Sequence, residues 1–86
     1  MNAAEKPWYV YMLECSDGTL YTGITICLEK RIGAHNRGKG SRYVKSRLPA
    51  ALLAYTTADT RSEASKQEYL IKQLPRNKKL ALAMSW

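Results

Sequence analysis

The chain has 86 residues, of which 45% are hydrophobic and 24% are charged, a balance typical of one globular domain. A chain of this length buries only about 60% of the surface that its unfolded form exposes, so a second module is not expected. We predict a single domain over residues 8–84, preceded by a flexible N-terminus at residues 1–7.

Localisation follows from what the sequence lacks. No apolar run resembles a signal peptide, and no stretch approaches the roughly 18 residues that span a bilayer. The two cysteines, Cys15 and Cys27, are too few for a disulfide framework and are not spaced as a metal knuckle. We expect a cytoplasmic protein with reduced thiols, and a single Cys15–Cys27 disulfide is the alternative.

Residues 8–14 and 19–24 predict two strands, because both stretches are short and the first is rich in β-branched and aromatic types. The turn between them decides which side chains share a face. A two-residue Asp-Gly turn would send Tyr11 and Tyr21 to opposite faces. A three-residue loop at 16–18, with its glycine as a left-handed bulge, would place both tyrosines on one face. We predict the three-residue form, since Ser-Asp-Gly suits it.

In this register Gly23 lies opposite Tyr11. A glycine within a strand costs stability and usually marks a bulge or the close approach of another group. Thr25 then predicts the N-cap of a helix from about residue 26 to residue 36. On that helix Arg31 and His35 are neighbours at the edge of the apolar stripe, so we expect them to point along the core.

The remaining elements complete a small sheet with helices. Residues 50–57 form an apolar run that predicts a third strand, central and covered on both faces. Residues 37–49 predict a basic loop with one helical turn near 41–45, and Pro75 separates two helices. The predicted fold class is α+β, a three-stranded antiparallel sheet flanked by helices, with the last helix at 76–84.

Thr60 predicts the start of the helix at 61–74. Its expected buried side consists of Ala64, Leu70, Ile71 and Leu74. Glu68 lies about 40° from Ala64 around the helix axis, at the margin of that side, where a lone carboxylate requires a partner.

The positive charge is concentrated in one segment. The net charge is +7, and no acidic residue occurs from residue 30 to residue 58. This segment favours a nucleic-acid partner over a merely solvated surface. Its cations suit phosphates, its small residues allow the backbone of the partner to approach closely, and its aromatic ring suits stacking on a base. The cations of this segment are Lys30, Arg31, Arg37, Lys39, Arg42, Lys45 and Arg47, interleaved with Gly38, Gly40, Ser41 and Tyr43.

The order of these residues resembles the GIY-YIG nuclease domain, and the middle of the chain (YTGIT, LEKR, AHN, GKGSRY) resembles its small stand-alone bacterial members. Residues 9–11 stand at the family's first triplet and residues 21–23 at its second. The resemblance implies a metal-dependent DNA endonuclease. The functional residues that it implies are the tyrosines Tyr11 and Tyr21, the helix residues Arg31 and His35, and the metal-binding Glu68.

Two positions depart from the family pattern. Tyr9 stands where the first triplet has glycine, which would restrict the backbone there. The family's late asparagine has only Asn77 as a candidate, close to Glu68 in sequence. We count these two residues, together with Gly23 of the second triplet, as candidate supporting residues.

The implied chemistry is phosphodiester hydrolysis. Glu68 would hold Mg²⁺ or Mn²⁺, and Arg31 would bind the phosphate. Both positive charges would stabilise the negative charge that develops on the phosphoryl oxygens. We predict Tyr21 as the general base with Tyr11 supporting it, and His35 is the alternative base or the acid. The same side chains also suit structural roles: strand packing for the tyrosines, a surface pair for Arg31 and His35, and an ion pair for Glu68.

Three functions compete. The first is an endonuclease of low sequence specificity, with structure-selective cleavage as an option, in repair or recombination, acting on DNA rather than RNA. The second is a non-catalytic DNA- or RNA-binding module with a vestigial nuclease site. The third is a protein-interaction domain whose positive charge meets an acidic partner.

Overall fold

The structure, a computed structural model, describes residues 6–86. Its elements are β1 (Trp8–Glu14), β2 (Leu20–Thr25), α1 (Leu28–Asn36), α2 (Arg42–Lys45), β3 (Ala51–Ala58), α3 (Arg61–Lys72) and α4 (Arg76–Ser85). The predicted α+β class with a three-stranded antiparallel sheet is confirmed. Most of the predicted flexible N-terminus, residues 1–7, lies outside the described residues. None of the described helices has the length and apolar content needed to cross a membrane.

The hairpin between β1 and β2 has the predicted three-residue form. Tyr11 pairs with Gly23, and Leu13 pairs with Tyr21. The turn closes with the N–H of Gly18 donating to the carbonyl of Cys15 at 2.9 Å, and Gly18 has a φ of 81°, as the glycine bulge requires. Tyr11 and Tyr21 therefore share one face of the sheet.

The central strand is β1, so the prediction that residues 50–57 form the centre is wrong. The strand order is β2-β1-β3, and β3 pairs on one side only. In β1 four consecutive side chains from Val10 to Leu13 are fully buried, because neighbouring strands and helices cover both of its faces. In β3 the side chains of Leu52, Leu53 and Tyr55 remain exposed. An apolar run marks a buried strand only where packing covers it.

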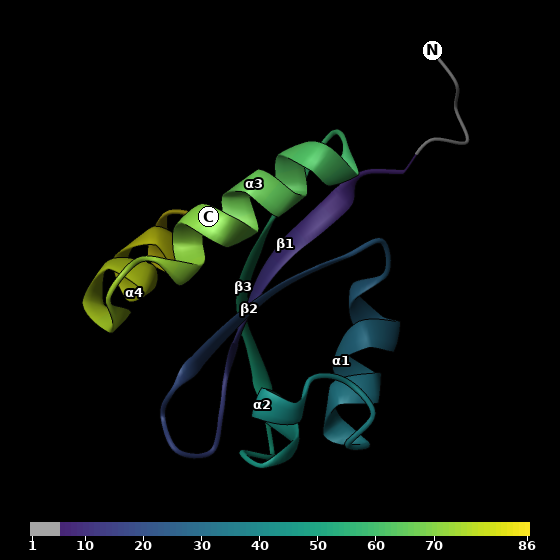
Figure 1. Cartoon of the computed structure of the whole chain (residues 1–86), viewed down its shortest axis with the longest axis vertical. Coiled ribbons are helices and arrows are strands. Elements are labelled where there is room, and N and C mark those ends of the chain that lie inside the picture. The colour runs from purple at the N-terminus through teal and green to yellow at the C-terminus, as the bar shows by residue number, and fades with distance from the viewer. Residues whose placement is uncertain (1–5) are drawn as a thin grey trace.

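Two hydrophobic clusters lie on opposite faces of the sheet, as the helix positions in Figure 1 show. On one face the side chains of Tyr11 and Leu13 pack against Val44 of α2 and against α1. On the other, Val10 and Met12 pack against α3 and α4. Alternation of side chains along β1 thus divides the molecule into a layer with α1 and α2 and a layer with α3 and α4.

The first helix begins at Leu28, two residues later than predicted. Thr25 is the last residue of β2, and its hydroxyl accepts the N–H of Cys27 at 3.1 Å, so it stabilises the turn before the helix rather than the helix itself. Cys27 occupies the N-cap position without a side-chain cap. Both cysteines are free.

The helix α3 begins as predicted, with the hydroxyl of Thr60 accepting the N–H of Glu63 at 3.1 Å. Ala64 and Ile71 are buried, but Leu70 is 64% exposed, which corrects its predicted place in the core. Leu70 lies about 120° from Ala64 around the axis, outside the narrow stripe that meets the sheet. The final helix α4 and the helical turn α2 occur where they were predicted.

Candidate active site

Four predicted site residues meet between β1, β2 and α1. The hydroxyl of Tyr11 lies 2.9 Å from Nε2 of His35, and Nε of Arg31 donates to the same hydroxyl at 3.4 Å. The ring of Tyr21 lies 5.3 Å from the imidazole of His35, measured between centroids. The spacing of Arg31 and His35 by one helical turn places both above the two tyrosines.

The contacts of His35 determine its tautomer. The backbone N–H of Ser41 donates to Nδ1 at 3.4 Å, and a backbone N–H can only donate. Neutral His35 therefore carries its proton on Nε2 and donates it to Tyr11. The hydroxyl oxygen of Tyr11 accepts from both His35 and Arg31.

Burial separates the four residues into two levels. Tyr11 and His35 are completely buried, whereas Tyr21 and Arg31 are partly exposed. Burial raises the pKa of Tyr11, while the hydrogen bond from Arg31 acts against that rise. Burial, together with the nearby charge of Arg31, lowers the pKa of His35. The hydrogen bond to Tyr11 raises the pKa of Arg31, so this guanidinium stays charged.

The lowered pKa of His35 predicts a pH-dependent stability. His35 is the only histidine, so acid titration near neutrality reports on one side chain. Below about pH 6.5 the unfolded chain binds a proton that the folded chain resists binding, so the free energy of unfolding falls as pH decreases from that value toward the folded pKa. Urea denaturation across this window should show the decrease, and His35→Gln should abolish it. An unchanged slope in the variant would contradict the assignment.

Two glycines leave the space that this arrangement occupies. A Cβ at Gly23 would collide with the hydroxyl of Tyr11 and lie 2.6 Å from its Cζ. A Cβ at Gly40 would collide with Nδ1 of His35 and lie 2.7 Å from its Cε1. The close approach expected at Gly23 is thus the Tyr11 side chain itself, and Gly40 plays the same part for His35.

Tyr21 faces the exposed edge of the sheet at β2. Nζ of Lys72 lies 5.6 Å from the centre of its ring, and Tyr43 stacks beside it with 6.1 Å between ring centroids. Glu68, one turn before Lys72 on α3, forms an ion pair with it at 3.4 Å. Burial is the main cause of the raised pKa of Tyr11, and the charge of Glu68 acts in the same direction as the last of its causes.

Glu68 suits a hard divalent cation but does not form an all-protein cage. The described residues contain no cluster of three or more His, Cys, Asp or Glu side chains that could surround an ion. The Glu68 side chain is 25% exposed. Mg²⁺ commonly keeps several waters and takes one or two carboxylates together with substrate phosphates, so a single accessible carboxylate fits this ion.

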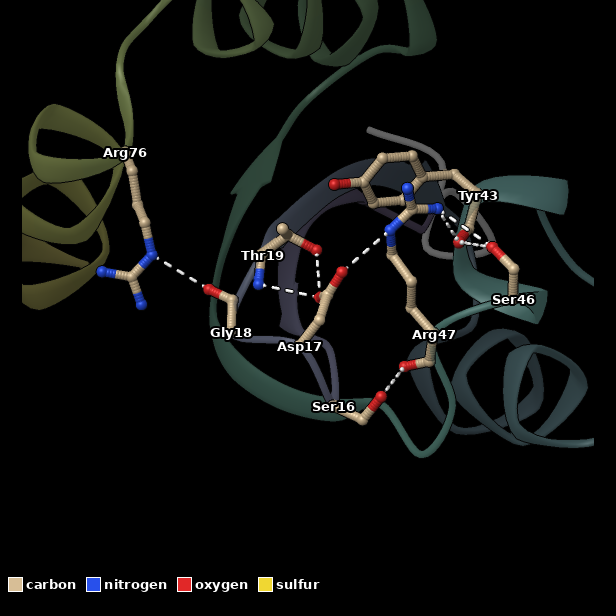
Figure 2. A network of polar contacts seen from close by, with 8 residues as sticks. All are labelled: Ser16, Asp17, Gly18, Thr19, Tyr43, Ser46, Arg47 and Arg76. Atoms are coloured by element: carbon tan, nitrogen blue, oxygen red, sulfur yellow. Dashed lines mark hydrogen bonds and ion pairs between the residues drawn. The ribbon is translucent and has the colours of Figure 1, made fainter.

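The predicted nucleic-acid-binding residues divide into two groups. Most are exposed on α1, α2 and the loop between them: Lys30, Arg37, Lys39, Arg42, Tyr43 and Lys45. Arg47 differs because its guanidinium is engaged within the protein. Nε pairs with Asp17 at 3.0 Å, and the group lies 3.8 Å from the centre of the Tyr43 ring, as Figure 2 shows. Arg47 therefore ties the basic loop to the hairpin turn.

Two of the possible supporting residues lie apart from the four central side chains. Tyr9 packs edge-on against Tyr55 of β3, with 5.6 Å between centroids. Asn77 is exposed near the start of α4. Neither contributes a hydrogen bond to the Tyr11–His35 pair.

Sequence reasoning missed three residues that support the site. The sequence places Ser41 and Gly40 in the basic segment expected to approach phosphates, but in the structure Ser41 fixes the His35 tautomer and Gly40 leaves room for its ring. The third residue is Asn36. Its side chain donates to the carbonyl of Ala50 and accepts the N–H of Ala50, both at 2.9 Å, which joins the end of α1 to the start of β3. The spacing of Asn36 and Ala50 offers no sequence signal.

These features define a class of protein: a small α+β domain in which two hairpin tyrosines meet an arginine and a histidine from the following helix. The profile of the GIY-YIG catalytic domain matches residues 7–81, and the chain belongs to the GIY-YIG family. The family resemblance seen in the sequence is confirmed.

Similar small proteins carry the name UPF0213. One from Desulfotalea psychrophila is 48% identical over 89 residues, covering 95% of this chain and 81% of that protein. One from Halobacterium salinarum is 47% identical over 74 residues, covering 86% of this chain and 96% of that protein.

Two solution NMR structures resemble this one. The UPF0213 protein BH0048 from Bacillus halodurans has 43% identity and a TM-score of 0.57, covering 88% of this chain and 81% of that chain. The protein EF2693 from E. faecalis has 37% identity and a TM-score of 0.65, covering 93% of this chain and 85% of that chain. The fold is therefore shared with small relatives of similar length.

Proposed function

We propose that this protein is a metal-dependent endonuclease that hydrolyses phosphodiester bonds in DNA, with low sequence specificity, in repair or recombination. The observation that carries the proposal is the two-level site. A partly exposed tyrosine and arginine lie above a buried tyrosine and histidine, beside a basic surface and near an accessible carboxylate. Membership of the GIY-YIG family supports the same reaction class.

Each exposed side chain has a role in this reaction. Tyr21 is the proposed general base, since it is partly exposed to solvent whereas Tyr11 and His35 are fully buried. Forming phenolate at pH 7 costs about 4 kcal/mol for an unperturbed tyrosine. Two cations lie beside this side chain: Nζ of Lys72 is 5.6 Å from the centre of the Tyr21 ring, and Arg31 donates to the neighbouring hydroxyl of Tyr11.

Arg31 is the proposed phosphate-binding group. Its Nε is used by Tyr11, which leaves the terminal nitrogens of the fork for phosphoryl oxygens. Tyr11 and His35 act as positioning residues, because they hold Arg31 without touching the substrate. Glu68 is the residue proposed to hold Mg²⁺ or Mn²⁺, and an ion there supplies positive charge to the phosphoryl group.

The test is nicking of supercoiled plasmid by purified protein with Mg²⁺ or with EDTA. Tyr21→Phe, which removes only the hydroxyl, is expected to lower the rate about 10²- to 10⁴-fold. Glu68→Gln should lower it as well and shift the Mg²⁺ dependence to higher concentration. The matched control is Tyr55→Phe, an exposed tyrosine of β3, which should leave the rate unchanged. Full activity of Tyr21→Phe would remove the tyrosine from the role of base.

One observation favours the second candidate, a nucleic-acid-binding module without turnover. Glu68 is paired with Lys72, and an ion must compete with that ammonium group for the carboxylate. Salt-sensitive DNA binding without cleavage of plasmid, branched or single-stranded DNA would support this alternative.

A further inference from the structure

A groove beside the proposed site follows the free edge of β2. Its floor is formed by β2 and its walls by α2 on one side and by α3 and α4 on the other. The lining residues are Leu20, Tyr21, Thr22, Tyr43, Lys72 and Lys79. Thr19 and Arg76 extend it toward the hairpin turn. We call this feature the β2-edge groove.

The walls of the β2-edge groove combine cations with an aromatic ring. Lys72 and Lys79 line one wall, and Tyr43, which is 38% exposed, lines the other. These lysines lie outside the basic segment at residues 30–47 and belong to the opposite layer of the molecule. The groove therefore brings positive charge from both layers to one edge of the sheet.

The ring of Tyr43 is held in place before any ligand arrives. Arg47 covers it at 3.8 Å, and Arg47 is itself anchored to Asp17 of the hairpin turn (Figure 2). On the other flank of the hairpin, Nε of Arg76 donates to the carbonyl of Gly18 at 2.9 Å. Both walls are thus attached to the same turn, so the entropic cost of ordering them when a ligand binds is small.

We propose that the β2-edge groove binds an unpaired nucleotide of the DNA substrate next to the phosphate that is cleaved. The inference rests on the proposed function and names its substrate class: DNA with a single-stranded arm. A base inside a duplex is stacked and paired, so its face is not free for a tyrosine, whereas an unpaired base stacks on aromatic rings while lysines contact its phosphates. Tyr21 belongs to both the groove and the catalytic site, which makes the two sites continuous.

The test compares two adjacent lysines of α4. Lys79→Glu reverses a charge inside the groove, and Lys78→Glu makes the same change at an exposed position outside it. Fluorescence anisotropy with EDTA would measure binding of a labelled oligothymidylate and of a duplex of equal length, without cleavage. We expect Lys79→Glu to weaken single-strand binding about tenfold more than Lys78→Glu and to reduce its salt slope by about one. Duplex binding should change equally in both variants.

Tyr43 provides the second comparison. Tyr43→Leu should lower single-strand affinity at least about fivefold, because a base–aromatic stack is lost, whereas Tyr43→Phe should retain it. Circular dichroism would verify that both variants are folded. Equal single-strand affinities for Lys79→Glu and Lys78→Glu would overturn the proposal.

The outcome is separable from that of the nuclease proposal. If the protein cleaves no DNA and Lys79→Glu still weakens single-strand binding selectively, the groove proposal stands and the nuclease proposal fails. If the protein cleaves DNA and Lys79→Glu has no selective effect on single-strand binding, the nuclease proposal stands and the groove proposal fails.

Discussion

Replacing Arg31 with alanine is expected to lower the rate of metal-dependent DNA cleavage about 10³-fold, because a positive group positioned at the developing phosphoryl charge is lost. DNA affinity should fall less than about tenfold, since many other cations contact the backbone. Plasmid nicking gives the rate, and anisotropy in EDTA gives the affinity.

Two further variants sharpen this result. Arg37→Ala removes an exposed cation from the end of α1, and it should weaken binding and cleavage in proportion. Arg31→Lys keeps the charge but loses the planar fork, so we expect it to remain strongly impaired. Equal losses of affinity and rate in Arg31→Ala would assign this residue to binding alone.

Gly23→Ala is the second substitution with a large expected effect. The added methyl group would occupy the space of the Tyr11 phenol, with Cζ 2.6 Å away, so the buried Tyr11 ring or the backbone of β2 must shift from its packed position. We expect a loss of about 1–3 kcal/mol in the free energy of unfolding. Cleavage should fall about 10²-fold in molecules that remain folded, since displacement of Tyr11 misplaces Arg31.

The matched control is Gly33→Ala in α1. A Cβ there would meet only the terminal Nη1 of the exposed Arg37 at 3.1 Å, and that end of the side chain is free to shift. Alanine is favoured over glycine inside a helix by about 0.5–1 kcal/mol, so Gly33→Ala should be neutral or stabilising. Urea denaturation of both variants, with nicking assays, compares them. A stable, active Gly23→Ala protein would show that the Tyr11 position does not matter.

The two-level arrangement explains how weakly acidic groups are organised in this site. The buried tyrosine and histidine are both neutral near pH 7, because burial disfavours the charged form of each. The exposed level carries the charge: Arg31 and Lys72 lie near Tyr21, and Glu68 forms an ion pair with Lys72. Under the proposed function, the neutral buried pair would orient Arg31 through its hydrogen bond to Tyr11, and the charged groups above would meet the phosphate.

Local chemistry in the sequence determined the hairpin and the start of α3. Ser-Asp-Gly at 16–18 specifies a turn whose geometry sets the register of β1 against β2, and that register alone places Tyr11 and Tyr21 on one face. The start of α3 follows equally from the hydroxyl of Thr60, which satisfies a backbone N–H within the same turn. Interactions between residues close in sequence can be read from it directly.

Contacts between distant segments were decided only by the tertiary structure. The strand β1 is central because β3 returns to its free side, although both strands contain continuous apolar runs. Gly40 and Ser41 acquire their roles because the basic loop folds back onto His35, and Arg47 because that loop meets the hairpin turn. The physical reason is that these side chains meet partners supplied by packing of whole elements, and no local periodicity records which partner will arrive.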